Sequence, residues 1–329
     1  MQRSMWEALQ QGNAQPIGGD YTKEAGLNIP AFFHGQGLKF LPVLGINEYD
    51  LRKAEKGNLP IVLCEDSYLR AASVFWDKSL DLLLRSSVSL TCDCKGYYID
   101  ATRPSNLEDM VQTAEVPEKD IEAAKRLIGK ITSLKLTKYN NQPQTVKLPG
   151  APGREKVLVI DQDFGDMSLK LGLAPESLFP EMVAAAADEN PGADVIVKTH
   201  PDALVAGGRK GCLSDIVESD RIHKLCVPAN PYSVLEQVSK VYVATSAFGF
   251  ESLLAGKPVR IFGMPWYAGW GVTQDEQKNA RRTRKRTVEE LFSIFYCSYS
   301  RYANPMTRKP CNIEEAIDIL TDLRNRLTQ

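Results

Sequence analysis

The stretch from residue 157 to residue 262 alternates short apolar segments with helical ones, and this alternation restricts the fold more than any other feature. The apolar segments are rich in β-branched residues and largely uncharged, which predicts strands at 157–160, 194–197, 222–227, 240–244 and 258–262. Helical patterns lie between or after them, at 178–189, 231–238, 248–254, 288–299 and 314–327. Strands and helices in this order predict a parallel sheet covered on both faces.

The first half of the chain is less regular but also mixes strands with helices. Strands are predicted at 60–64 and 96–100, and helices at 104–112 and 118–134. A connector rich in Pro, Gly and Asn follows, between residues 140 and 153. We therefore expect two α/β domains with a ligand cleft between them. These are an acceptor-side domain at 1–150, whose first 40 residues lack a clear pattern, and a nucleotide-binding domain with closing helices at 151–329.

Charge and cysteine content exclude several classes of protein. The 329 residues carry 40 Lys and Arg against 41 Asp and Glu, a net charge of -1, which argues against a general nucleic-acid binder. Seven cysteines and three histidines without paired ligand spacing favour reduced thiols over disulfides or a structural zinc site. The sequence has no apolar run of about 18 residues and no apolar leader, so we expect a cytoplasmic protein unless a partner moves it.

Polar residues follow four of the predicted strands of the second half. They lie in the segments 161–166, 198–202, 245–251 and 263–271. Because ligands of open parallel sheets bind beyond the carboxyl ends of the strands, we expect these segments to meet at one rim of the sheet.

Each of these segments has a structural interpretation as well as a functional one. Thr245 and Ser246 would cap the following helix, or hold a phosphate at its start, and the two uses are compatible. Glu251, about one turn later, would cap the helix or accept hydrogen bonds from a ribose diol. His200, made rigid by Pro201, is either a structural histidine or, with Lys198 on the same side of the strand, a donor to a phosphate or carboxylate.

The acidic loop leaves three alternatives open. Asp161, Asp163 and Asp166 are typical turn residues, but such a loop also binds divalent cations, or supplies one working carboxylate as a base or nucleophile. Asp161, at the strand end, would instead fasten the loop.

Two further segments have a structural and a functional interpretation. Trp266 and Tyr267 lie in a loop that would either pack on the surface or stack on a sugar or base. The basic run at 281–286 is either a solvated face or a patch that approaches anionic lipid headgroups.

The motifs, taken together and in order, resemble those of the capsule polysaccharide β-Kdo transferases of the KpsC type. In the second half they are Asp161-Gln162-x-x-x-Asp166, Val197-Lys198-x-His200-Pro201-Asp202, Thr245-Ser246-x-x-Gly249-Phe250-Glu251 with the Leu253–Val259 continuation, and Pro265–Gly271. Upstream they are Glu65-Asp66-x-x-x-Arg70, Gly96–Ala101 and Lys138–Asn140. The resemblance covers roughly residues 60–325, and this single module is most similar to the N-terminal module of the tandem proteins.

The resemblance implies a GT-B-like fold of two Rossmann-like domains and a retaining transfer of Kdo from CMP-Kdo. The acceptor would be a lipid-linked Kdo in the linker of a capsule polysaccharide, and the scheme uses no cofactor and no metal. It further implies contact with the inner face of the inner membrane and with capsule assembly and polysaccharide transport proteins, but with no nucleic acid.

The resemblance also gives the candidate residues their functions. Asp166 would be the nucleophile, and His200 and Ser246 would hold the CMP phosphate with help from Lys198. The remaining donor-site residues would be Gln162, Pro201, Thr245, Gly249 and, near the ribose, Glu251. Sugar or acceptor would contact Glu65, Asp66, Arg70, Trp266 and Tyr267.

Two other hypotheses belong to different classes. In the first, the chain is another GT-B enzyme, such as a sialyltransferase or a nucleotide-sugar epimerase. In the second, it is a non-catalytic module that binds glycolipid or recruits export machinery. Stabilisation by CMP but not UDP would favour the CMP-sugar enzymes over the epimerase.

Overall fold

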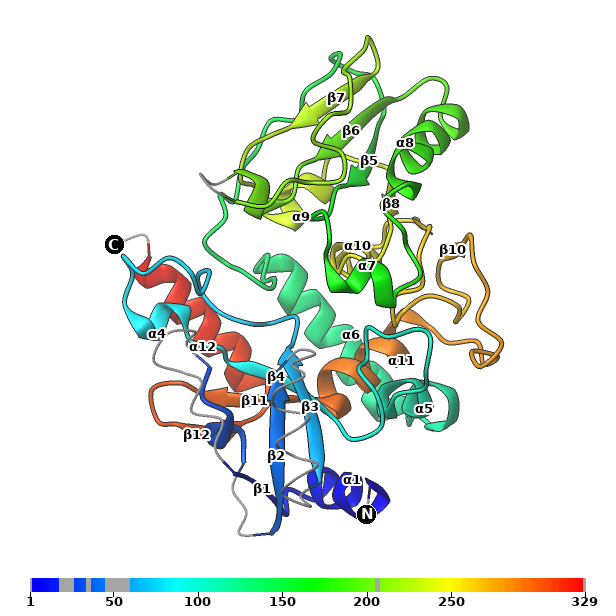
Figure 1. Cartoon of the computed structure of the whole chain (residues 1–329). Coiled ribbons are helices and arrows are strands. Elements are labelled where there is room, and N and C mark those ends of the chain that lie inside the picture. Colours follow the sequence, from blue (N-terminus) through cyan, green and yellow to red (C-terminus); the bar gives the residue numbers. More distant parts are fainter. Residues whose placement is uncertain (1, 18–26, 34–36, 45–59, 205–207, 328–329) are drawn as a thin grey trace. The chain divides into compact units, whose positions relative to one another are not determined.

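The computed structural model describes residues 2–17, 27–33, 37–44, 60–204 and 208–327. The chain forms two compact units, and neither is one continuous stretch of sequence (Figure 1). Unit 1 contains Met1–Tyr98, Pro104–Asn141 and Phe292–Gln329, and unit 2 contains Ile99–Arg103 and Gln142–Leu291. Among the described residues each unit has its own six-stranded sheet, so the expected α/β class with two sheets is confirmed.

The sheet of unit 2 is entirely parallel, as the alternation predicts. Its strands are β5 (Lys156–Ile160), β6 (Asp194–Lys198), β7 (Ile222–Leu225), β8 (Lys240–Val243), β9 (Val259–Ile261) and β10 (Gln274–Asp275). They lie in the order β10-β9-β8-β5-β6-β7, so the chain builds outward from β5 to β7 and then returns to the other side of β5. The strand order therefore reverses between β5 and β8, and in open α/β sheets ligands bind beyond the carboxyl ends of the strands at such a point.

Short connecting helices complete unit 2. They are α7 (Met167–Leu171), α8 (Leu178–Glu189), η2 (Pro201–Leu204), α9 (Pro231–Leu235), α10 (Phe248–Leu254) and the start of α11 (Val288–Phe292). The apolar face of α8 supplies buried Phe179, Met182 and Val183 to the core against β5 and β6. Each such side chain contributes roughly 1.5–3 kcal/mol, so this helix is held mainly by its packing. The predicted strands and helices of this unit are confirmed, with ends that differ by at most three residues.

The sheet of unit 1 is mixed. Its strands are β1 (Ala14–Pro16), β2 (Leu38–Leu44), β3 (Ile61–Asp66), β4 (Ser89–Asp93), β11 (Ser300–Asn304) and β12 (Lys309–Cys311), in the order β1-β2-β3-β4-β11-β12. The pairs β1–β2 and β2–β3 are parallel, whereas β3–β4, β4–β11 and β11–β12 are antiparallel. The described sheet of this unit is therefore mixed, unlike the parallel sheet expected of a Rossmann-like domain.

The predicted strand at 96–100 is wrong. Residues 94–96 form bends and residues 98 and 99 a turn, and the strand lies earlier, at β4. The chain turns after β4 because Oδ1 of Asp93 accepts the backbone N–H groups of Lys95 and Gly96, at 2.8 and 3.0 Å, and Gly96 fits there because a Cβ would lie 2.4 Å from the carbonyl oxygen of Pro104. From Ile99 to Arg103 the chain belongs to unit 2, where the backbone N–H of Ala101 donates to the carbonyl of Leu171 at 2.9 Å.

We expected the closing helices to form one domain with residues 151–329. The structure instead assigns Phe292–Gln329 to unit 1. Unit 1 contains α1 (Gln2–Gln10), η1 (Ile29–Phe32), α4 (Leu82–Arg85), α5 (Asn106–Thr113), α6 (Glu118–Ser133) and α12 (Ile313–Arg326). The predicted helix at 288–299 changes after α11 into a π-helical segment, Ser293–Tyr299, which leads into β11. β11 pairs with β4, and Arg324 of α12 donates to the carbonyl of Leu134 at 2.6 Å, so tertiary pairing assigns the chain end to unit 1.

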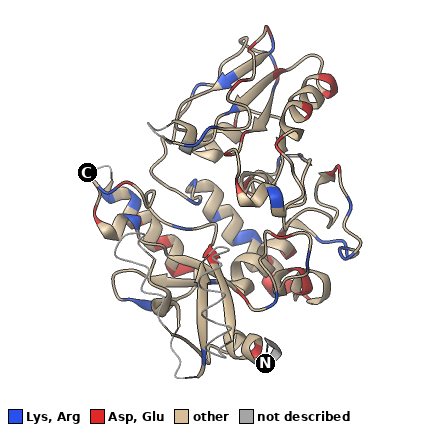
Figure 2. Ribbon diagram, in the orientation of Figure 1, with Lys and Arg blue, Asp and Glu red and all other residues tan. Residues whose placement is uncertain are grey.

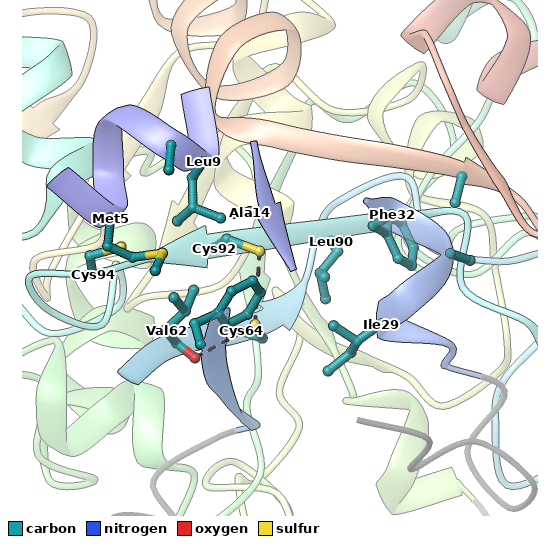
Figure 3. Close-up of a cluster of buried hydrophobic side chains, with 14 of the residues drawn as sticks. Met5, Leu9, Ala14, Ile29, Phe32, Val62, Cys64, Leu90, Cys92 and Cys94 are labelled. Atoms are coloured by element: carbon teal, nitrogen blue, oxygen red, sulfur yellow. Dashed lines mark hydrogen bonds between the residues drawn. The ribbon is translucent and has the colours of Figure 1, made fainter. Parts of the chain in front are cut away.

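The core of unit 1 contains buried cysteines (Figure 3). Cys64 of β3 and Cys92 of β4 face each other across the antiparallel pair, with their sulfur atoms 3.8 Å apart. They pack among apolar side chains such as Met5, Leu9 and Phe32. These thiols are free, and they act as small apolar core residues.

Charge is evenly distributed over both units. Figure 2 shows Lys and Arg interspersed with Asp and Glu along the ribbons, in keeping with the net charge of -1. Among the helices of the described residues, none is both long and apolar enough to cross a membrane.

Candidate active site

The loops after β5 and β8 are joined by side chains at the point where the strand order reverses. The amide nitrogen of Gln162 lies 2.9 Å from Oγ1 of Thr245, and its oxygen accepts the backbone N–H of Thr245 at 2.9 Å. Ser168 completes the network, with Oγ 3.2 Å from both side chains. Because Gln162 and Thr245 are buried, their polar groups serve mainly to hold the two loops together.

Asp166 caps the short helix α7. Its Oδ1 accepts the backbone N–H of Ser168 at 2.8 Å, and Gly165 before it has a φ of +78° that suits the tight turn. The side chain is partly exposed, and Oδ2 makes no hydrogen bond to any residue that the structure describes. The turn interpretation is therefore correct, and it leaves one carboxylate oxygen available for chemistry.

Asp161 fastens the loop, as one of the sequence alternatives proposed. Its Oδ1 accepts the backbone N–H groups of Gln162 and Leu213, both at 2.9 Å. Gly211 is needed beside it, since a Cβ there would lie 2.0 Å from Oδ2 of Asp161. Burial raises the pKa of this carboxyl to about 6, partly offset by the two backbone donors.

Replacing Asp161 by asparagine should change how stability depends on pH. The folded-state pKa near 6 lies above the unfolded value near 4, so the native wild type gains stability from this proton at low pH and loses it as the pH rises through 6. The asparagine side chain retains the oxygen acceptor but does not titrate. We expect the free energy of unfolding of Asp161→Asn, relative to wild type, to rise by about 1.4 kcal/mol between pH 5 and pH 8.

Urea unfolding at these two pH values measures the difference. Asp188→Asn, on the exposed side of α8, is the control and should follow the wild type at both. An Asp161→Asn variant that also follows the wild type would contradict the assignment.

His200 and Lys198 lie at the end of β6. His200 Nδ1 is 2.8 Å from Oδ1 of Asp163, and the imidazole is 32% exposed. Burial lowers the pKa of Lys198 to about 8, while the carboxylate of Glu251 opposes this shift. Glu251 is itself buried in α10, and it interacts electrostatically with Tyr232 of α9 as well. The structure thus brings Lys198 and Glu251 together, whereas the side chain of Pro201 lies outside the described residues.

Ser246 begins the turn into α10. Its Oγ accepts the backbone N–H of Phe248 at 3.2 Å, and its carbonyl accepts the hydroxyl of Tyr267. Gly249 lies against the same tyrosine, where a Cβ would approach the hydroxyl oxygen to 2.2 Å. The glycine is therefore required for packing.

Of the two interpretations of Trp266 and Tyr267, packing and stacking on a sugar or base, burial of both side chains favours packing. Trp266 is 4% exposed and Tyr267 is 0% exposed, and both rings pack against Phe250 of α10. Trp270 is buried as well and donates from its indole nitrogen to the carbonyl of Trp266 at 2.8 Å. The loop is a packed support for the Ser246 turn, which is the structural alternative stated above.

The basic run at 281–286 is mostly structural. Arg282 is buried and donates to the carbonyls of Pro265 and Ala268, at 2.6 and 2.8 Å. Arg286 is buried beside Glu290, and Arg281 donates to the carbonyl of Ala101. Since only Lys285 of the basic side chains in this run is fully exposed, the run does not form a continuous surface for lipid headgroups.

The upstream candidates form a separate polar cluster in unit 1. Arg70 is 1% exposed, and its Nε donates to Oδ2 of Asp66 at 2.6 Å. Glu65 accepts the hydroxyl of Tyr97, and burial raises its pKa. Burial disfavours the charged form of Lys138, but Tyr139 and the carboxylates of Glu65 and Asp66 together outweigh it and raise its pKa.

These contacts divide the predicted residues into supporting and accessible groups. Arg70 is wholly buried and holds Asp66, whereas Glu65 remains partly exposed. Sequence reasoning placed Lys138 only in a motif and gave Asp163 no separate function. The sequence feature that pointed to a function for Asp163 was its position on the loop between Asp161 and Asp166. In the described part of the chain, no group of three or more His, Cys, Asp or Glu side chains is arranged to hold a metal ion.

Known proteins resemble this chain in sequence. Residues 136–302 match the family described as "Capsule polysaccharide biosynthesis protein". LipA, the capsule polysaccharide modification protein of Neisseria meningitidis serogroup B, is 38% identical over 285 residues, which are 83% of this chain and 39% of LipA. The lipopolysaccharide-processing protein LpsZ of Rhizobium meliloti is 36% identical over 270 residues, 80% of this chain and 59% of LpsZ. The chain thus spans less than two thirds of these curated relatives.

Two solved structures resemble it as well. The β-Kdo 2,4-transferase of Thermosulfurimonas dismutans KpsC is 35% identical with a TM-score of 0.82, covering 94% of this chain and 98% of that one. The β-Kdo 2,7-transferase of the same KpsC is 27% identical with a TM-score of 0.62, covering 88% and 86%. The chain therefore belongs to the capsule polysaccharide biosynthesis protein family and is a KpsC-type protein.

Proposed function

We propose that this protein is a retaining glycosyltransferase that moves Kdo from CMP-Kdo to a lipid-linked Kdo acceptor during synthesis of a capsule polysaccharide linker. The observation that carries the proposal is that Asp166, His200 and Ser246 follow three parallel strands whose carboxyl ends share one edge of a single sheet. The likeness to the β-Kdo 2,4-transferase of KpsC supports the same activity. In this proposal unit 2 is the Rossmann-like, donor-binding half of a GT-B-like enzyme, and unit 1 contacts the acceptor.

Hydrogen bonds support the closeness of these three residues. Asp166 accepts from Ser168, which contacts Thr245, the neighbour of Ser246. On the other side, the backbone N–H of Asp166 donates to the carbonyl of Asp163, whose carboxylate contacts His200. One chain of short contacts thus links the carboxylate to both candidate phosphate-binding loops.

The proposed reaction has two displacements. In the first, Oδ2 of Asp166 forms a bond to the anomeric carbon of Kdo while the bond from that carbon to the phosphate oxygen breaks. His200, Ser246 and Lys198 would hold the CMP phosphate and stabilise the charge that develops on it. In the second, an acceptor hydroxyl attacks the same carbon, releases its proton and regenerates Asp166. Two inversions give overall retention, as in retaining glycosidases.

Lys198 suits this function because it is buried and already has an acidic neighbour. Its ammonium group makes no hydrogen bond to the residues that the structure describes, so its donors remain for an anion such as the CMP phosphate. Glu251 is proposed to accept the ribose hydroxyls. Glu65, which is partly exposed and has a raised pKa, is the proposed acceptor contact of unit 1, with Asp66 and Arg70 shaping its surroundings.

Incubation with CMP-Kdo and a Kdo-terminated glycolipid tests the proposal. We expect release of CMP and a product extended by one β-linked Kdo. CMP should raise the thermal midpoint of the protein, whereas UDP should not. Turnover of CMP-sialic acid instead of CMP-Kdo would point to another CMP-sugar transferase, and glycolipid binding without CMP release would indicate a non-catalytic module.

A further inference from the structure

Asp163 lies against His200 but has no function in the scheme above. Its Oδ1 is 2.8 Å from Nδ1 of His200, and the carboxylate is 4% exposed while the imidazole is 32% exposed. Within the described part of the chain no hydrogen bond satisfies this buried oxygen, so the ring nitrogen beside it is the nearby donor group that a small turn of the imidazole would supply. A buried anion is thus placed against one nitrogen of a partly exposed ring.

The backbone holds Asp163 more firmly than it holds His200. Asp163 pairs with Gly211 in an antiparallel bridge, and on either side Phe164 donates to Lys210 at 2.8 Å and Cys212 donates to Gln162 at 2.9 Å. His200 instead lies in the connection between β6 and the short helix η2. The backbone of Asp163 is therefore held on both sides, and its buried carboxylate lies beside the ring from this held position.

We infer that Asp163 is a positioning residue, which holds Nδ1 of His200 as a donor and turns Nε2 toward the phosphate of the sugar donor. The inference rests on the proposed function of His200. A carboxylate on one imidazole nitrogen fixes both the tautomer and the ring orientation, and removal of such a partner typically costs about 10–100-fold in affinity or activity. The carbonyl of Asp163 also accepts the backbone N–H of Asp166 at 3.2 Å, so one residue orients the phosphate contact and supports the nucleophile's turn.

Binding of CMP and of cytidine separates this function from a structural one. Asp163→Ala should weaken CMP binding by about 10-fold or more and leave cytidine binding unchanged, because only CMP carries the phosphate. Asp163→Asn retains an oxygen acceptor and should stay close to wild type. In the His200→Gln background, Asp163→Ala should have no further effect on CMP affinity. Asp188→Ala, exposed on α8, is the control and should leave both affinities unchanged.

Equal losses of CMP and cytidine affinity in Asp163→Ala would overturn the inference, as would an undiminished effect in the His200→Gln background. A wild-type protein that does not bind CMP would refute the proposed function instead. A second measurement, which needs no ligand, then still tests Asp163.

The chain has three histidines, so ¹⁵N-histidine spectra with His200→Gln as the assignment control identify the His200 signals. We expect Nδ1 of His200 to carry a proton in the wild type. In Asp163→Ala we expect only a fraction of the molecules to carry that proton. An Nδ1 of His200 without a proton in the wild type would overturn the inference.

Discussion

Replacement of Asp166 by asparagine should reduce CMP release from CMP-Kdo by on the order of 10³-fold or more, with the fold intact. Asparagine caps a helix about as well as aspartate, so Oδ1 would still accept the backbone N–H of Ser168. What it loses is the negative charge and the nucleophilic oxygen. Asparagine is thus a sharper probe than alanine, which would also remove the cap at a cost of about 1 kcal/mol.

Intact mass after mixing with CMP-Kdo measures the same step directly. The wild type should gain the mass of one Kdo residue, and Asp166→Asn should not. The matched control is Asp81→Asn, because Asp81 caps α4 through the same contact, at 2.7 Å from the backbone N–H of Leu83. This control should form the adduct as the wild type does. Undiminished CMP release by Asp166→Asn would show that another group is the nucleophile.

Arg282→Ala should lower the free energy of unfolding by about 3 kcal/mol. Its Nη1 donates to two carbonyls, of Pro265 and Ala268, and its guanidinium lies 5.7 Å from the ring centre of Trp270. Alanine would leave the carbonyl of Ala268 without this donor, at about 1–3 kcal/mol, and would remove the cation–π contact and one of the two donors to the carbonyl of Pro265, which keeps the backbone N–H of Ala268. Arg282 is therefore a buried support of the aromatic loop.

Thermal unfolding provides the measurement for Arg282→Ala. A loss of about 3 kcal/mol should lower the midpoint by roughly 6–12 °C for a unit of this size. Lys285→Ala is the matched control, since Lys285 belongs to the same basic run but is exposed, and it should change the midpoint little. If the two variants unfold alike, Arg282 is not the support that its contacts indicate.

The sequence predicted unit 2 well because its structure follows from short, local patterns. Five of its six strands, β5 to β9, contain short apolar runs beside helical patterns, whereas β10 is polar and was not predicted. The strands of unit 1 were harder to predict from the sequence. Ser89–Asp93 contains several polar residues, although all five residues are buried in β4. Its partner β11 comes about 200 residues later in the chain, and no local pattern encodes that pairing.

The candidate site was predictable in position but not in detail. Because parallel strands end at one edge, the segments after β5, β6 and β8, with Gln162, His200 and Thr245, were expected at the same edge of the sheet, and the strand order agrees with this. The functions of the three aspartates depended on which backbone N–H groups and side chains come near them. Likewise, burial of Trp266 and Arg282 is a tertiary property, so composition alone suggested exposed aromatic and basic surfaces that the fold does not provide.

The interrupted path of the chain through unit 1 has a consequence for biosynthesis. A ribosome delivers all of unit 2 before it delivers β11, the strand that covers the open side of β4. Until then the nascent chain carries an unpaired strand edge, which is a template for aggregation. Expression in cells should consequently depend on chaperone capacity more than the stability of the folded protein would suggest, and slower elongation would not help before β11 emerges.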